Sequence, residues 1–153
     1  MRNVILAVFT ALAFISCQPA YCYPTDSIRL LPEDVMSVYD GDTIYVNVES
    51  VPDIFGLNVG IRLRGIDTPE VRSTCPTEAH RLMERDKAYA AKEYLRERIF
   101  TAKRIVILNM SRDRYFRIDA DVYIDGVNVN QEMIDKGFAI SYDGGAKTSW
   151  CGK

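Results

Sequence analysis

The segment VMSVYDGDTIYVNV (35–48) indicates the fold more directly than any other part of this sequence. Two runs rich in β-forming residues, 35–39 and 43–48, flank Asp-Gly-Asp at 40–42. Asp-Gly between such runs is a hairpin signal, because both residues tolerate the backbone geometry of turns. From Ile44 to Val48 every second residue is aliphatic, as in a strand with one buried face. The segment therefore predicts an antiparallel hairpin that packs on a core.

Further elements follow this hairpin along the chain. Residues 51–56 contain Pro and Gly and are expected to form a loop, and 58–66 has the alternation of a third strand. A helix is predicted over 78–99, because four small or aliphatic residues fall on one stripe of it: Ala88, Ala91, Leu95 and Ile99. The remaining predicted elements are strands at 103–110 and 120–124 and a short helix at 130–136.

Five strands with a helix between the third and fourth are typical of a small closed barrel. We therefore expect a mainly β or α+β fold, a five-stranded OB-fold barrel with packed helices, although other small folds share this pattern. The chain has 153 residues, of which 48% are hydrophobic and 26% charged, which fits one globular domain. Its formal net charge of −2 excludes a global basic field, so a nucleic-acid partner would need a local cluster of basic residues.

The N-terminus has the layout of a secretory signal peptide: Arg2 is followed by an apolar run over 4–15 and a short polar stretch. We expect a signal peptide at 1–22 and a single domain at 23–153, hence an exported protein, periplasmic or secreted. Cleavage after Cys22 would leave two cysteines, an even number for an oxidising compartment. Cleavage after Ala20 stays open, and so does a lipoprotein in which Cys17 is lipidated and anchors the protein to a membrane.

A second segment, RLRGIDTPE (62–70), carries the chemistry together with Asp-Gly-Asp-Thr (40–43). The two segments supply carboxylates and guanidinium groups at neighbouring strand ends. Carboxylates and carbonyls are the ligands that calcium prefers, and arginine offers paired donors matched to phosphate. A hard cation, guanidinium donors and a carboxylate base are what phosphodiester hydrolysis requires. Either segment alone is more often a plain turn or a solvated strand.

With Asp-Arg-Tyr-Phe-Arg at 113–117, these segments resemble the three signature segments of the staphylococcal (thermonuclease) nuclease family. The resemblance extends from about residue 35 to 142. It implies the OB-fold barrel, a calcium cofactor, and hydrolysis of DNA and RNA with little sequence preference. It also implies these roles for individual residues: Asp42, Asp67 and the Thr68 carbonyl as calcium ligands, Asp40 in the outer shell, Glu70 as general base, Arg62 and Arg117 on the phosphate, and Tyr115 near the bound nucleotide.

Two features depart from that family. Phe116 stands where the family has Gly, so the direction of the Arg117 side chain depends on how the turn accommodates a Phe. The segment after Tyr142 has only Trp150 as an apolar anchor, without the further helix of better-known relatives. Because Cys75 and Cys151 remain after the expected cleavage, we predict that they form a disulfide that fixes this segment; two unpaired thiols are the alternative.

Three functions are compatible with these observations. The first is the exported calcium-dependent nuclease, which we expect to be a monomer with no protein partner. The second is a catalytically weak OB-fold module that binds single-stranded nucleic acid. The third is an exported surface protein without nucleic-acid contact, which the negative net charge favours slightly. All five residues aligned with the family's catalytic and metal-binding positions are present, which favours the nuclease.

Overall fold

The computed structural model describes residues 26–152. The signal peptide predicted at 1–22, with Cys17 and Cys22, lies outside the described residues. Within 26–152, no helix combines the length and the apolar character that crossing a membrane requires.

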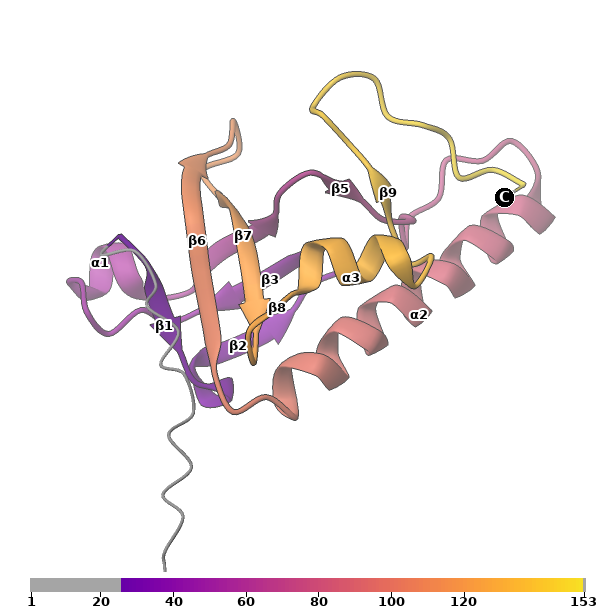
Figure 1. Cartoon of the computed structure of the whole chain (residues 1–153). Coiled ribbons are helices and arrows are strands. Elements are labelled where there is room, and N and C mark those ends of the chain that lie inside the picture. Colours follow the sequence, from indigo (N-terminus) through magenta and orange to yellow (C-terminus); the bar gives the residue numbers. More distant parts are fainter. Residues whose placement is uncertain (1–25, 153) are drawn as a thin grey trace, which may run out of the picture.

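The architecture is an α+β barrel whose curled sheet has helices packed against it (Figure 1). The main sheet has seven strands in the order β1-β6-β7-β4-β3-β2, and β8 pairs with β7. Its strands are β1 (Ile28–Leu30), β2 (Val35–Val38), β3 (Thr43–Val46), β4 (Val59–Leu63), β6 (Ile105–Arg112), β7 (Ile118–Ile124) and β8 (Val127–Asn128). Two further strands, β5 (Ile66–Asp67) and β9 (Ile140–Ser141), form a separate antiparallel pair.

Chain connectivity explains why the sheet curls. The strands at its two ends, β1 and β2, are consecutive in the chain and separated only by the 3-10 turn η1 (Pro32–Asp34). The neighbouring pairs are antiparallel except for β4 and β7, which run parallel. The predicted OB-type barrel is confirmed, and the five predicted strands correspond to β2, β3, β4, β6 and β7. The short strands β1 and β8 were not predicted.

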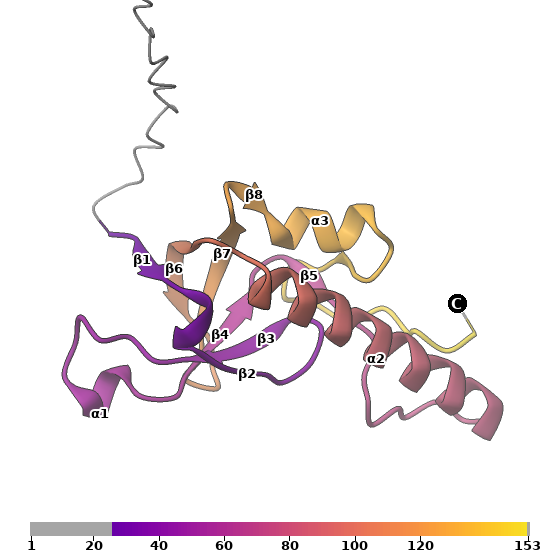
Figure 2. The ribbon, with the colours of Figure 1, turned by 90° about the horizontal axis from the view of Figure 1, so that it is seen from below.

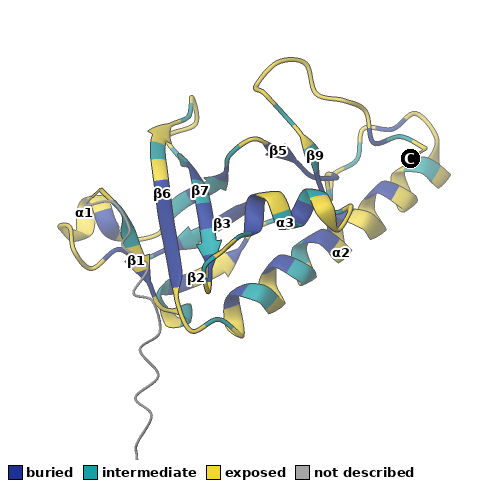
Figure 3. Cartoon of the chain, in the orientation of Figure 1, coloured by how far each residue is buried: buried dark blue, intermediate teal, exposed yellow. Residues whose placement is uncertain are grey.

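Helix α2 (Glu78–Phe100) covers one side of the sheet and extends beyond it (Figure 2). The predicted stripe is confirmed, because Ala88, Ala91, Leu95 and Ile99 are all buried. Figure 3 shows this division along α2, with buried positions toward the sheet and exposed ones on the opposite side. The helix begins at Thr77, whose side chain accepts a hydrogen bond from the His80 N–H, the usual way of satisfying a free donor in the first turn.

Helix α3 (Val129–Asp135) packs on β7 and carries a buried asparagine. The Asn130 side chain accepts from Val122 N at 3.0 Å and donates to the carbonyls of Arg64 at 2.9 Å and Ala120 at 3.0 Å. A buried amide with its partners satisfied orders the backbone around it. Asn130 thereby fixes the end of β4 and the turn that leads to β5.

Two local predictions were wrong. Residues 51–56 are not entirely loop, since Asp53–Gly56 form the one-turn helix α1. The strand predicted over 58–66 is interrupted, because the chain turns at Gly65, which has φ +75°. This left-handed conformation suits glycine, and it separates β4 from β5. As a result Asp67 lies in the β5–β9 pair and not at the end of the barrel strand.

Candidate functional site

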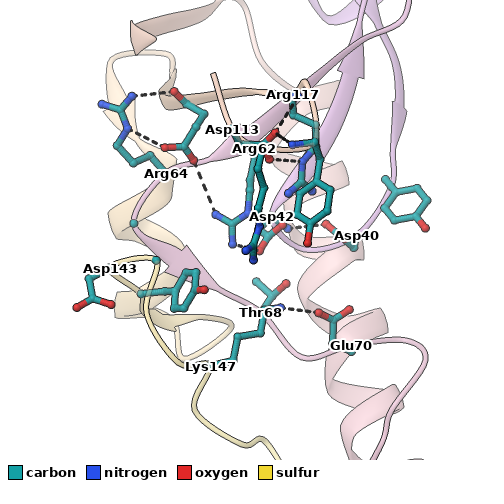
Figure 4. A pocket seen from close by; sticks show the side chains of 17 residues that line it. Asp40, Asp42, Arg62, Arg64, Thr68, Glu70, Asp113, Arg117, Asp143 and Lys147 are labelled. Atoms are coloured by element: carbon teal, nitrogen blue, oxygen red, sulfur yellow. Dashed lines mark hydrogen bonds and ion pairs between the residues drawn. The ribbon is translucent and has the colours of Figure 1, made fainter. Parts of the chain in front are cut away.

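An open pocket of about 870 Å³ lies where the β2–β3 turn, β4, the β6–β7 turn and the chain after β5 meet. The predicted site residues that line it are Asp40, Asp42, Arg62, Thr68, Glu70, Tyr115 and Arg117. Asp67 is 1% exposed and lies behind the pocket lining. Figure 4 shows the labelled side chains of this pocket.

The β2–β3 turn brings Asp40 and Asp42 together. The Asp42 N–H donates to Asp40 Oδ1 at 3.0 Å, and the Thr43 hydroxyl donates to Asp42 Oδ1 at 2.8 Å. Gly41 allows this turn to press against its neighbours: a Cβ added there would lie 2.8 Å from Ala91 Cβ and 3.0 Å from Thr68 Cγ2. The glycine is therefore needed here for close packing against α2.

The surroundings of Asp42 disfavour the charged form of its carboxyl group. It is buried and lies beside Asp40, and both effects raise its pKa to about 7, although Arg62, Thr43 and Lys147 act in the opposite direction. Burial disfavours the charged form of a carboxyl, and a neighbouring negative charge does the same. A bound cation would relieve both effects.

Arg62 is held rigidly on β4. Its guanidinium donates to the carbonyls of Leu63 at 3.1 Å and Ile66 at 2.9 Å, and to Asp42 Oδ2 at 3.2 Å. Its Cζ also lies 5.7 Å from the centre of the Tyr142 ring. These contacts come from β4, β5, the β2–β3 turn and the segment after β9, so the direction of Arg62 depends on the whole fold.

Arg117 points into the same pocket from the β6–β7 turn. Its Nε donates to Asp113 Oδ2 at 2.8 Å, its backbone N–H donates to Asp113 Oδ1 at 3.0 Å, and its Nη1 lies 3.3 Å from the Thr43 hydroxyl. Burial acts to raise the pKa of Asp113, but the Arg117 side chain and the N–H groups of Tyr115 and Arg117 outweigh it and lower that pKa. Gly60 leaves room for the stem, since a Cβ there would lie 3.1 Å from Arg117 Cγ.

Phe116 leaves Arg117 directed at the site, at a conformational cost. It adopts φ +65° with its side chain 83% exposed, so the turn keeps the left-handed conformation that a glycine would favour. Non-glycine residues in this region cost about 1–2 kcal/mol. Tyr115 beside it is 65% exposed, and its ring lies 5.1 Å from Arg114 Cζ and 5.5 Å from Arg117 Cζ.

Asp67 has partners that sequence reasoning missed. Its Oδ2 accepts a hydrogen bond from Trp150 Nε1 at 3.1 Å, and Lys147 Nζ lies 2.8 Å from its Oδ1. The second contact is an ion pair, and apart from Lys147 no polar group within residues 26–152 is bonded to Oδ1. Lys147 also donates to Glu70 Oε1 at 2.7 Å. Burial acts to lower the pKa of Lys147, but its contacts with Asp67 and Glu70 outweigh it and raise that pKa.

A side chain of helix α2 holds the backbone of Glu70. Its backbone N–H donates to Oε1 of the buried Glu84 at 3.2 Å, while its own carboxylate is 53% exposed at the pocket.

The predicted disulfide is confirmed: Cys75 and Cys151 are bonded, with their Cα atoms 5.5 Å apart. Asp113 belongs to the third signature segment, but nothing local to the sequence distinguishes Glu84 or Lys147 from other charged residues.

Comparison with known proteins agrees with this geometry. Residues 60–149 match the model of the staphylococcal nuclease homologue family. The chain is also 27% identical over 125 residues to an uncharacterized protein of Methanocaldococcus jannaschii, an alignment that covers 71% of this chain and 58% of that relative. The chain thus spans little more than half the length of the relative it matches. The family match includes the second and third signature segments, and the fold brings Asp40 and Asp42 to the same pocket. The chain belongs to the staphylococcal nuclease homologue family, a family of nucleases.

Proposed function

We propose that this protein is an exported, calcium-dependent nuclease that hydrolyses phosphodiester bonds of DNA and RNA with little sequence preference. The observation that carries the proposal is one pocket of about 870 Å³ that is lined by Arg62 and Arg117 and also by Asp42 and Glu70. Guanidinium groups and carboxylates in one open pocket match a phosphodiester and an attacking water. Contacts to phosphate carry no base identity, which is why little sequence preference is expected.

Each residue has a distinct task in this proposal. Arg62 and Arg117 bind the phosphate oxygens and stabilise the negative charge that develops on them. Their positions are set beforehand by backbone carbonyls on Arg62 and by Asp113 on Arg117, so little reorganisation is needed during the reaction. Glu70 accepts a proton from the attacking water, because its carboxylate lines the pocket and, at 53% exposed, has access to solvent.

Calcium fits the donor set of the site. Asp42 and Asp67 are buried carboxylates, and the charge of Asp67 is met at Oδ1 by the Lys147 ammonium, 2.8 Å away. In the proposal these two side chains and the Thr68 carbonyl hold the ion, with Asp40 beside Asp42. Oxygen ligands of this kind favour a hard cation over a soft one. When bound, calcium supplies positive charge close to the phosphate.

Export is proposed from the N-terminal sequence, and the Cys75–Cys151 disulfide supports it, since disulfides persist in oxidising compartments. The substrate is nucleic acid, and we propose a monomer. Attachment to a membrane is proposed only for a form lipidated at Cys17.

A nucleic-acid-binding module of low activity is the second candidate. Tyr115 favours it, because an exposed ring beside two guanidinium groups is suited to stacking with a base. Binding and hydrolysis are separable in one experiment.

Purified protein is incubated with single- and double-stranded DNA and with RNA, in calcium and in excess chelator. We expect cleavage only with calcium, and we expect Glu70→Gln to bind substrate but to cleave it at least about 100-fold more slowly. Full activity in chelator would rule out the calcium dependence. Binding without cleavage in calcium would favour the module, and neither binding nor cleavage would exclude both.

A further inference from the structure

The chain after β9 lines part of the pocket with a segment that is fixed at both ends, residues 143–151, which we call the C-terminal strap. Before the strap, the Tyr142 N–H donates to the Gly65 carbonyl at 2.8 Å, next to the β5–β9 pair. At its other end, Cys151 is bonded to Cys75 in the loop that follows Glu70. Figure 1 shows the strap returning from β9 to the start of α2. The strap is therefore held against the site.

The strap places one ammonium group between two acids of the site. Lys147 Nζ lies 2.8 Å from Asp67 Oδ1 and 2.7 Å from Glu70 Oε1, and Figure 4 shows its side chain directed toward Thr68 and Glu70. Asp67 belongs to β5 and Glu70 to the loop after it, so Lys147 bridges two carboxylates that are assigned different tasks in the proposed reaction.

The Lys147 ammonium and a divalent cation cannot both occupy the position beside Asp67 Oδ1, because both are positively charged. A divalent cation that binds Asp67 Oδ1 must approach the oxygen that Lys147 already contacts at 2.8 Å. The metal and the ammonium would then lie beside the same oxygen atom, and their positive charges would repel each other strongly in a partly buried site. The Lys147 side chain is 50% exposed, and lysine carries its charge on a flexible stem, so its ammonium can turn out to solvent when a metal binds. Trp150, in contrast, contacts Oδ2 and can stay in place.

We propose that Lys147 is an internal counter-cation that competes with the divalent metal for Asp67 and sets the affinity of the site for calcium. In the metal-free protein Lys147 neutralises Asp67 and keeps Glu70 in an ion pair; metal binding displaces it and frees the Glu70 carboxylate for water. The inference rests on the proposed calcium-dependent function. It adds that calcium binding releases Glu70, the proposed general base, from its ion pair with Lys147.

The first test measures calcium affinity by isothermal titration calorimetry of the full exported protein. Lys147→Met removes the competing charge. We expect calcium to bind this variant about tenfold more tightly or better, because calcium no longer has to displace the ammonium from Asp67. Lys147→Arg keeps a cation and should stay close to the wild type. Lys103→Met, at an exposed position before β6, controls for the loss of one positive charge elsewhere.

The second test needs no variant. Wild-type protein is treated with a low concentration of an amine-reactive reagent, with and without calcium, and peptides are quantified by mass spectrometry. Lys147 should react faster when calcium is present, whereas Lys103 should react equally under both conditions.

The outcomes separate this inference from the proposed function. Equal calcium affinity of the wild type and Lys147→Met, or an unchanged reactivity of Lys147 on calcium binding, would overturn the competition while leaving a calcium-dependent nuclease intact. A failure of the wild type and of all three variants to bind calcium would remove calcium from the proposed function and the competition with it.

Discussion

At the scale of single residues, each charged side chain of the site is held or neutralised by a specific neighbouring group. Arg62 reaches the pocket from β4, held by backbone carbonyls, and Arg117 reaches it from the β6–β7 turn, held by Asp113. Asp42 and Asp67 are buried acids whose counter-ions within the described residues are Arg62 and Lys147. Each of these groups can be altered individually.

Replacing either arginine tests the proposal that Arg62 and Arg117 bind the phosphate. Arg62→Ala and Arg117→Ala should each lower turnover by about 100-fold or more, because a charged donor to the transition state is lost. Lysine should substitute poorly, since it lacks the paired donors of the guanidinium. Arg96→Ala, on the solvent side of α2 with a side chain 58% exposed, is the matched control. Turnover of Arg117→Ala near the wild-type value would transfer the role to Arg114, in the same turn.

The raised pKa of Asp42 predicts a pH-dependent cost in stability. The unfolded carboxyl titrates near 3.8 and the folded one near 7, so the folded protein binds the proton more tightly. The cost is therefore absent below pH 3.8, grows as the pH rises through this interval, and is complete above pH 7. Without calcium, Asp42→Asn should stabilise the protein at pH 8 on the order of 2 kcal/mol and change little at pH 4.

Denaturant unfolding in chelator at the two pH values measures this difference. Asp86→Asn on the exposed side of α2 should show no comparable gain. A loss of stability at pH 8 would mean that the Arg62 ion pair outweighs the cost of burying the acid. Asp42→Asn should also abolish calcium-dependent cleavage.

At the scale of elements, turns determine where the side chains point. The β6–β7 turn keeps a left-handed residue at position 116 although the residue is Phe. The β2–β3 turn approaches α2 so closely that a Cβ at Gly41 would meet Ala91. The backbone of these two turns sets the direction in which their side chains, Asp42 from one and Arg117 from the other, enter the site.

Phe116→Gly tests the cost of that left-handed residue. Glycine adopts positive φ without strain, although it adds freedom to the unfolded chain, and we expect a net gain in stability of about 1 kcal/mol. The Phe ring is 83% exposed, so little packing is lost. Thermal unfolding measures the gain, and activity should be retained because Asp113 holds Arg117 independently. Phe116→Ala, which keeps a Cβ, should show no such gain.

At the scale of the whole molecule, the Cys75–Cys151 disulfide joins the strap to the loop after Glu70. The two cysteines are 76 residues apart in sequence. Closing a loop of this length stabilises the folded state by about 4.5 kcal/mol in the chain-entropy model, from which native strain subtracts. The bond therefore acts together with the contacts of Lys147 and Trp150 on Asp67 to hold the strap.

Reduction of the disulfide should lower the melting temperature by about 10 °C. Activity should fall only at higher temperature, because Glu84 Oε1, which accepts from the Glu70 N–H, lies on α2 and is not part of the bond, although Glu84 Oε2 lies 3.2 Å from Cys75 Sγ. Scanning calorimetry with and without reductant, beside a Cys75→Ser/Cys151→Ser variant that should not respond to reductant, measures the effect. An unchanged melting temperature on complete reduction would contradict it.

Much of the fold was predictable because its signals are local. The hairpin at 35–48 and the buried stripe of α2 follow from periodicity, which reports the face that each element buries. The family resemblance also identified Phe116 as standing in a glycine position, and its φ of +65° agrees with that expectation. The pairing of Cys75 with Cys151 was predicted from their number and the expected compartment.

The tertiary structure alone decided the contacts that join distant parts of the chain. Lys147 and Trp150 reach Asp67 across about 80 residues, and Glu84 reaches the backbone of Glu70 from the second turn of α2. A lysine or a glutamate in a charged stretch has the same local pattern whether it faces solvent or a buried acid. The sequence determines which residues can form strands, helices and turns. Which charge meets which acid is set by the packing of the folded chain, because these contacts depend on distances between atoms far apart in sequence.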